Sequence, residues 1–466
     1  MKHILPQHRV SCKKASRRQW LVGLLAGFVA LFITLCVQSC SLMQANPIHE
    51  KSTQKNVDIV WAVASDLHVM DTSIVKRPGK AFDDYLKNDR KLLSYSRVML
   101  DSLSARMLKL KPKYLLISGD LTKDGAYVSH QYLIHHFLAP LREAGIQPIV
   151  VPGNHDIMNP HAYIYDGDKS VRTRTINPDE FRELYGPYGY NQALSNDSSS
   201  LSYVVQLSPK VRLLCLDANQ YKKNDFNLDL CYWNGVLSES TLAYVAEQAH
   251  QAQKLGMRML IMIHHGVIPH WRLQNQASPG YVLDNASELR RLCYTYNIEM
   301  CMTGHAHCQD ISEHSYWGSH LYDVETGSLV TYPCPYRVMR LHGDSLSIVS
   351  DSIEIGSGFE DIAKEALIEG VATFSLSSVS KSFPDTLRKH IATDIGRLMV
   401  VHAHGDEVLS DKLQQDLIGL DHQMRHYSFL QRLRMSAVIK SLSKDSGVAD
   451  NDVDLELSPV IAMTNK

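Results

Sequence analysis

Five apolar segments of the chain each run directly into His, Asp or Asn residues, and this feature most limits what the chain can fold into. Short apolar runs of this kind are typical of buried strands. Residues just beyond the carboxyl ends of strands line the ligand crevice of an open α/β sheet, so we expect the five polar groups to share one hollow. The groups are Asp66-Leu67-His68, Gly119-Asp120, Gly153-Asn154-His155-Asp156, His264-His265-Gly266 and Gly304-His305-Ala306-His307.

The segments between these runs favour helices, because their apolar residues recur at spacings of three and four. Strands that alternate with helices predict an α/β fold in which helices cover the sheets. With 44% hydrophobic residues in 466, the chain has material for a large core, which excludes a disordered chain or a small disulfide scaffold. Strands are predicted at 59–65, 114–120, 148–154, 212–218, 259–265 and 300–306, and helices at 90–109, 126–143, 239–255 and 286–296.

The pattern changes after Gly356. From Phe359 to about Leu442 the spacing is mostly helical, and the last twenty or so residues are polar and predicted to be frayed. We therefore divide the chain into a leader (1–40), a polar tether (41–56), an α/β domain (57–355) and a helical C-terminal region with a frayed tail (356–466).

The N-terminus has the order of an export signal. Residues 1–40 contain six basic and no acidic side chains, and eighteen uncharged residues run from Trp20 to Val37. The following Val37-Gln38-Ser39-Cys40 resembles a bacterial lipobox, which implies that Cys40 becomes an acylated N-terminus. One alternative is an uncleaved signal anchor, which is a helix that spans the membrane. The other alternative is plain secretion. In all three cases the body is exported, so we expect it in the cell envelope, outside the cytoplasm.

The rest of the chain is mildly acidic, with 42 basic and 49 acidic residues beyond position 40. Binding to a nucleic-acid polymer needs clustered Lys and Arg, so we expect no such partner.

The five polar groups together suit a metal site. They offer carboxylates, an amide and several imidazoles, about the inventory that two divalent cations need when they share one carboxylate. Mixed nitrogen and oxygen donors favour Mn, Fe or Zn over Ca or Mg. Each motif alone is also compatible with a turn, because Gly, Asn and Asp favour positive φ.

The order D-x-H, GD, GNHD, H and GHxH resembles the calcineurin-like metallophosphoesterases, over roughly residues 57–355. The resemblance implies a four-layer α/β/β/α sandwich with a dinuclear centre, here followed by a C-terminal helical appendage. It also implies that Asp120 bridges the two metals. The remaining ligands would be Asp66, His68 and His307 for one metal, and Asn154, His264 and His305 for the other.

The resemblance further implies a hydrolase of phosphoric esters, with a hydroxide bridging the two metals as the nucleophile. His155 would stabilise charge or protonate the leaving oxygen, and Asp156 would orient His155 or the ligands. His265 either faces the cleft or packs against it. Arg172 and Arg174 are candidates for contact with the substrate phosphate, and the alternative for both is a solvated loop.

Two motifs suggest the branch of the family. This chain reads GNHD and GDLTKDG, whereas phosphoprotein phosphatases read GNHE and GDxxDR at the same places. This resembles the class III cyclic-nucleotide phosphodiesterases of exported bacterial type. We therefore expect a small phosphoester substrate, such as a cyclic nucleotide or a similar diester. A monoesterase or pyrophosphatase acting on nucleotides or lipid-linked phosphates remains open, as does a surface lipoprotein that mainly binds a partner. Seven intact ligand positions argue against a purely binding role.

Overall fold

The computed structural model describes residues 58–87, 89–427, 429–444 and 447–460. The predicted leader, Cys40 and the tether lie outside these residues. Among the helices described, none combines the length and the apolar character needed to cross a membrane.

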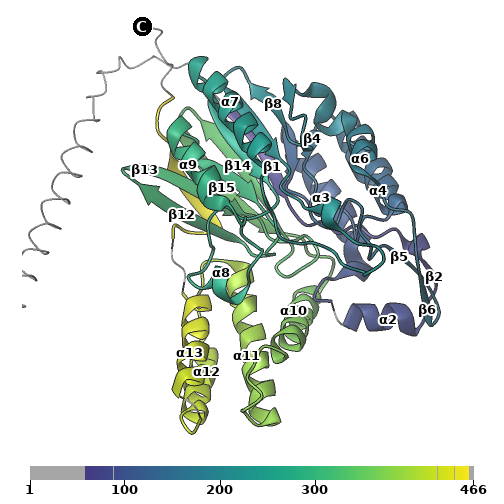
Figure 1. Ribbon diagram of the computed structural model, residues 1–466, viewed down its shortest axis with the longest axis vertical. Helices are drawn as coiled ribbons and strands as arrows, with labels where there is room; N and C mark the ends of the chain where they lie inside the picture. The colour runs from purple at the N-terminus through teal and green to yellow at the C-terminus, as the bar shows by residue number, and fades with distance from the viewer. Residues whose placement is uncertain (1–57, 88, 428, 445–446, 461–466) are drawn as a thin grey trace, which may run out of the picture. The chain divides into compact units, whose positions relative to one another are not determined.

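Two large sheets form the centre of the fold (Figure 1). The strands that lead into the polar motifs lie parallel to one another within each sheet, as the sequence pattern predicts. The first sheet has the order β16 (Asp452–Glu456), β15 (Ser345–Ser352), β14 (Pro335–His342), β1 (Asp58–Ala64), β3 (Tyr114–Ile117) and β4 (Gln147–Val150). The second has the order β12 (Asp310–Tyr316), β13 (Ser319–Glu325), β11 (Met300–Thr303), β10 (Arg258–Ile263), β9 (Val211–Leu216), β8 (Tyr203–Ser208) and β7 (Ser195–Asn196).

Alternate side chains of the second sheet enter two separate cores. On β9, Leu213 and Cys215 pack between the sheets, whereas Leu214 and Leu216 pack under helices α7 (Glu239–Lys254) and α9 (Ala286–Tyr296). Every residue of β10 is buried, which explains why that strand reads as one continuous apolar run.

The main core also contains side chains from helices on the first sheet. These are α3 (Ser96–Leu110), α4 (Tyr127–Leu133) and α5 (Ala139–Glu143), with a π-helical segment at Ile134–Leu138 between the last two. Helices thus flank both sheets, with α7 and α9 on one side and α3 and α4 on the other (Figure 1). The predicted four-layer α/β/β/α fold is confirmed.

Smaller elements surround the sandwich. A third sheet pairs β2 (Val75–Arg77), β5 (Tyr163–Asp166) and β6 (Lys169–Arg172). The short helices are α2 (Lys80–Lys87), α6 (Pro178–Leu184) and α8 (Gln274–Ala277).

Four helices occupy the C-terminal region predicted to be helical. They are α10 (Phe359–Leu376), α11 (Asp385–His404), α12 (Asp411–Met424) and α13 (Phe429–Leu442). The chain then returns to the first sheet, where β16 pairs antiparallel with β15. This corrects the prediction of a frayed tail: Val453 and Leu455 alternate with acidic residues, and Leu455 is buried in the main core. The four helices are therefore an insertion between two neighbouring strands.

The insertion is fixed to the start of β12 by buried polar contacts. His402, at the end of α11, forms an ion pair with Glu407, and both lie near Asp310. The backbone N–H of Gln309 donates to the carbonyl of Ala403 at 3.1 Å. Because β12 begins soon after the GHxH motif, these contacts hold the helices beside the loop that carries His305 and His307.

Candidate metal centre

The two sheets bring the ends of five strands to one place. All seven residues predicted as metal ligands lie there, and each is at most 7% exposed. The ligands of the first sheet lie in the loops just after β1, β3 and β4. Those of the second sheet lie in the loops just after β10 and β11. The seven are Asp66, His68, Asp120, Asn154, His264, His305 and His307.

The ligand atoms form two groups that meet at Asp120. In the first, Nε2 of His307 lies 3.1 Å from Oδ1 of Asp66 and 3.4 Å from Nε2 of His68. In the second, Nε2 of His264 lies 3.4 Å from Oδ2 of Asp120 and 3.2 Å from Oδ1 of Asn154. Asp120 Oδ2 also lies 3.5 Å from His68 Nε2, and this contact joins the two groups.

These distances fit ligands around metal ions. Bonds of about 2.0–2.2 Å place neighbouring ligands roughly 3.0–3.5 Å apart at the edges of a coordination polyhedron. Within the part of the chain that the structure describes, the buried Nε2 of His305 has no hydrogen-bond partner, which is costly unless a cation binds it. The side chains present therefore fit two divalent cations that share the carboxylate of Asp120.

Further hydrogen bonds set the direction of the ligands. Nδ1 of His264 donates to the carbonyl oxygen of Ser118 at 2.8 Å, which leaves the lone pair of Nε2 directed at Asp120. Nδ1 of His307 lies 3.1 Å from the hydroxyl of Thr331. Partners of this kind fix the tautomer and the ring orientation of metal-binding imidazoles.

The protonation states suit metal binding at most positions. Burial raises the pKa of Asp120, but the neighbouring His264 and His155 outweigh it and hold the pKa well below its usual range. Burial lowers the pKa of His305 well below its usual value, so this imidazole is neutral. At His264, burial lowers the pKa, but the carboxylates of Asp120 and Asp66 together outweigh burial and raise the pKa to about 9. The carboxylates that attract this proton would equally attract a cation in its place.

The backbone at the centre is strained. Five ligands have positive φ angles in the left-handed region, a conformation that few residues other than glycine adopt. Each such residue costs on the order of 1–3 kcal/mol and persists only where the surrounding structure enforces it. The five are Asp66 (50°), His68 (39°), Asp120 (47°), His305 (77°) and His307 (65°).

Glycines allow the strand-end loops to approach one another. A Cβ on Gly153 would lie 2.1 Å from both the backbone nitrogen and Oδ1 of Asp120. A Cβ on Gly304 would lie 1.9 Å from the hydroxyl oxygen of Ser65 and 2.6 Å from Oδ2 of Asp66. Real Cβ atoms do not approach so closely, so the glycines of GNHD and GHxH are required for packing against a ligand in another loop.

His155 lies at the edge of the centre with its side chain 24% exposed. Its backbone N–H donates to Oδ1 of Asp120 at 2.8 Å, and its Nε2 lies 4.0 Å from Oδ2 of Asp120. Its Nδ1 is 2.8 Å from Oδ1 of Asp124, a buried carboxylate that also pairs with Lys123. Burial lowers the pKa of His155, but Asp120 and Asp124 outweigh it, so the pKa is raised.

The sequence reasoning missed Asp124. It stands within GDLTKDG, four residues after Asp120, but nothing in that spacing shows that the loop turns the carboxylate toward His155. A second acidic residue in a loop just after a metal motif is the one signal that could have pointed to it.

Asp156 supports the loops and is directed away from the ligand atoms. Its carboxylate accepts the backbone N–H groups of Gly153 (2.8 Å), Leu121 (3.0 Å) and Thr122 (2.9 Å). It thereby joins the GD loop to the GNHD loop. This agrees with a supporting role in orienting the ligands, with no contact to the reacting groups.

The three residues proposed to bind substrate do not line the cavity beside the metal ligands. His265 is buried, and its Nε2 lies 3.0 Å from the carbonyl oxygen of Trp233, so it packs behind the cleft. Arg172 ends β6 and pairs with Asp229, and Arg174 pairs with Glu180. Neither arginine lines the cavity that the metal ligands share.

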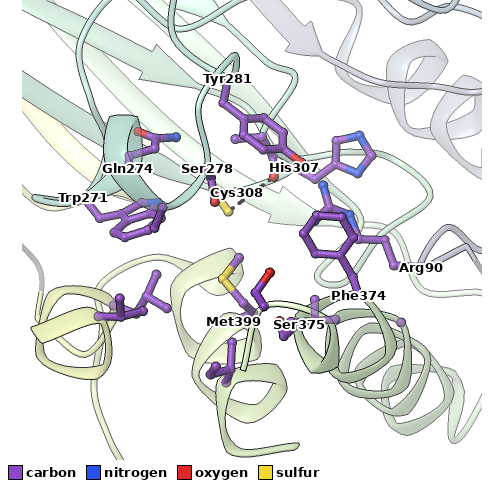
Figure 2. Close-up of a pocket in the computed structure, with 18 of the residues that line it drawn as sticks. Arg90, Trp271, Gln274, Ser278, Tyr281, His307, Cys308, Phe374, Ser375 and Met399 are labelled. Atoms are coloured by element: carbon purple, nitrogen blue, oxygen red, sulfur yellow. Dashed lines mark hydrogen bonds between the residues drawn. The ribbon is translucent and has the colours of Figure 1, made fainter. Parts of the chain in front are cut away.

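One cavity of about 960 Å³ opens from the metal ligands toward the C-terminal helices (Figure 2). Asp120, Asn154, His155, His305 and His307 line its inner end. The cationic side chains of Arg90 and Lys91, which the sequence reasoning did not single out, lie in the same wall. Lys91 pairs with Asp89 of the same wall at 3.3 Å, and the positive charge of Arg90 beside the ligands favours an anionic substrate.

Comparison with known proteins agrees with this geometry. Residues 61–309 match the family described as calcineurin-like phosphoesterase. No curated protein matches the sequence.

Several solved structures are similar in fold. A dimetal phosphatase from Danio rerio is 14% identical over 62% of this chain and 95% of its own, with a TM-score of 0.44. GAP50, the anchor in the inner membrane complex of Plasmodium, is 9% identical over 67% of this chain and 94% of its own, with a TM-score of 0.34. Vacuolar Protein Sorting 29 from Cryptosporidium parvum is 12% identical over 64% of this chain and 94% of its own, with a TM-score of 0.24.

The packing of Gly153 gives a prediction about metal content. We expect Gly153→Ala to displace Asp120 and to reduce the bound metal from two ions per chain to less than one, as measured by inductively coupled plasma mass spectrometry. The matched control is Gly419→Ala on α12, where an added Cβ meets nothing within 4 Å. Equal metal content in the two variants would show that the close approach is not needed.

Proposed function

The chain belongs to the calcineurin-like phosphoesterase family, hydrolases that act on phosphoester bonds with divalent metal ions, and from this premise we propose that it is a metal-dependent phosphodiesterase. The observation that carries the proposal is the continuous cavity of about 960 Å³ that holds the metal ligands, His155, Arg90 and Lys91. A diester has substituents on two sides of its phosphorus, and this cavity has room well beyond a single phosphate group.

The side chains of the centre have separate tasks in such a reaction. Two divalent cations, when bound, would polarise the phosphoryl oxygens and lower the pKa of a water molecule. Arg90 and Lys91 would attract the anionic substrate to the cavity. His155 would supply a proton from Nε2 to the leaving oxygen, because its Nδ1 faces Asp124.

The ligand types support one class of metal ion. Imidazole nitrogens and carboxylate oxygens together favour Mn, Fe or Zn over Ca or Mg, which prefer oxygen alone. We propose two ions of this class, with Asp120 shared between them.

A pair of chromogenic esters tests the proposed activity. With Mn²⁺ added, we expect bis(p-nitrophenyl) phosphate to be hydrolysed with a kcat/KM at least about tenfold above that for p-nitrophenyl phosphate, because the open cavity admits both substituents. A chelator should abolish the activity, and Mn²⁺ should restore it. Faster hydrolysis of the monoester would favour the monoesterase alternative, and hydrolysis of neither ester by metal-loaded protein would favour the binding-protein alternative.

Cyclic nucleotides are one candidate within this class, because they are small diesters of the kind that the sequence motifs suggest. Their hydrolysis can be measured with 3′,5′-cyclic AMP by separating the AMP product by chromatography.

The pairing of His155 with Asp124 gives a prediction about pH. General acids contribute about 10²- to 10⁴-fold to rate, so we expect His155→Gln to lower kcat by a factor in this range while two metals stay bound. An acid must be protonated to act, so activity should fall as the pH rises through the pKa of His155. Asp124→Asn removes a cause that raises this pKa, so the alkaline fall should move to lower pH.

The control for these variants is His135→Gln, because His135 is an exposed histidine outside the centre. An unchanged alkaline limb in Asp124→Asn, together with full activity in His155→Gln, would contradict the assigned roles.

We also propose that the protein is an exported lipoprotein of the cell envelope. The proposal rests on the basic residues before Trp20, the uncharged run to Val37 and the Val-Gln-Ser-Cys order that ends at Cys40. A lipid on Cys40 would attach the chain to the membrane and leave the catalytic domain outside the cytoplasm; an uncleaved N-terminal helix is the alternative anchor.

Lipid labelling tests this attachment. In bacteria expressing the full chain with radioactive palmitate, we expect Cys40→Ser to abolish the label. Cys36→Ser should keep it, because Cys36 lies four residues before the expected cleavage point. Continued labelling of Cys40→Ser would exclude the lipoprotein.

A further inference from the structure

The outer half of the cavity differs in chemistry from the half that holds the metal ligands. α11 contributes Ile395 and Met399 to its wall, and α13 contributes Met435 and Val438. Trp271, which precedes α8, lies on the opposite wall from Met399 (Figure 2). All of these side chains are apolar and buried or half-buried. The outer half is therefore mostly apolar, although Arg434, Gln274 and Gln276 also line the cavity.

Phe374 on α10 adds an exposed aromatic ring to the same wall. It lines the cavity although 76% of its surface is exposed. A ligand that covers this exposed apolar ring removes it from water, which favours binding. Ser278 and Ser375 lie between the two ends of the cavity and offer hydroxyl groups there (Figure 2).

The apolar wall comes mostly from a part of the chain outside the family match. That match covers residues 61–309, whereas α10, α11 and α13 lie within 359–442, in the insertion between β15 and β16. The sandwich thus supplies the charged end of the cavity, and the insertion supplies most of the apolar end.

We infer that the substrate is an amphiphilic phosphoester, whose phosphate binds at the metal centre and whose alkyl or acyl chain lies between α10, α11 and α13. The inference rests on the proposed function and names its substrate class. The two ends belong to one cavity, so a single molecule can occupy both. An alkyl chain gains contact with the methionine, isoleucine and valine side chains of the outer half. These side chains offer the polar groups of a nucleoside no hydrogen bond, so a nucleoside would have to find its partners among the fewer polar residues there, such as Gln274, Gln276 and Arg434.

A pair of esters that differ only in chain length tests the inference. In p-nitrophenyl methyl phosphate and p-nitrophenyl dodecyl phosphate, water adds to phosphorus, the bond to the p-nitrophenyl oxygen breaks, and p-nitrophenolate and the alkyl phosphate are released. Using Mn²⁺-loaded protein below the micelle concentration, we expect kcat/KM for the dodecyl ester to exceed that for the methyl ester at least about tenfold, since each buried CH₂ adds to binding.

Variants of the wall locate the chain. We expect Phe374→Ser and Met399→Gln each to lower the ratio of the two kcat/KM values about threefold or more, because each removes apolar contact with the chain. Ile362→Ser is the matched control for Phe374→Ser, since Ile362 is also an exposed apolar residue of α10 but does not line the cavity. Phe374 is mostly exposed, so its replacement does not threaten folding.

The outcomes separate the inference from the proposed function. Equal kcat/KM values for the two esters, or faster hydrolysis of 3′,5′-cyclic AMP than of the dodecyl ester, would overturn the inference while the phosphodiesterase stands. A chain-length preference that neither wall variant alters would also overturn it, because the chain would then bind elsewhere. Hydrolysis of none of these esters would refute the proposed function itself.

Discussion

The carboxylate of Asp120 is the one group that both halves of the site share, and the rest of the centre depends on its position. It contacts His68 from the first sheet, His264 from the second and His155 from the GNHD loop. A buried carboxylate among imidazoles is stable only where opposite charge or hydrogen bonds compensate its lost hydration. Two sheets that each end at this point supply those partners, and no single sheet could do so.

Holding the ligands around Asp120 requires a backbone that a loose loop would not adopt. Five ligands lie in the left-handed region, at a cost on the order of several kcal/mol in sum. The loops that carry them are short and follow strands whose last three or four residues are buried, and Asp156 joins the GD loop to the GNHD loop through backbone hydrogen bonds. The large core between and around the sheets therefore sustains the strain.

The sequence predicted which side chains lie together because their placement follows from strand direction. The strands at 59–65 and 114–120 are parallel in the first sheet, and those at 259–265 and 300–306 are parallel in the second, so the residues after them gather at one edge of each sheet. The prediction failed where tertiary contacts decide the outcome. Asp124 is paired with His155 by the folding of its own loop, which spacing alone does not reveal.

Two other differences between the sequence predictions and the structure also arise from tertiary contacts. Arg172 follows the GNHD motif closely in sequence, yet the third sheet leads it away to pair with Asp229. The sequence predicts a frayed tail because its last twenty or so residues are polar, but the two apolar residues of DVDLE alternate with acidic ones, and that is enough for a strand with one buried face. In both cases the neighbouring element, and not local composition, determined the structure.

The return of the chain as β16 also bears on how selectivity is built. Because β15 and β16 are neighbours in the first sheet, the two ends of the helical insertion are fixed to the sandwich, and contacts near Asp310 fix α11 beside the ligand loop. An insertion held at both ends presents its apolar side chains to the metal centre at a constant position. Metal binding depends on the backbone conformation of the strained sandwich loops. Residues such as Met399 and Val438 have no described contact with a metal ligand, so their substitution would leave Asp120 in place. For the amphiphilic substrate that we propose, chemistry and selectivity would therefore rest on different parts of the chain that line one cavity.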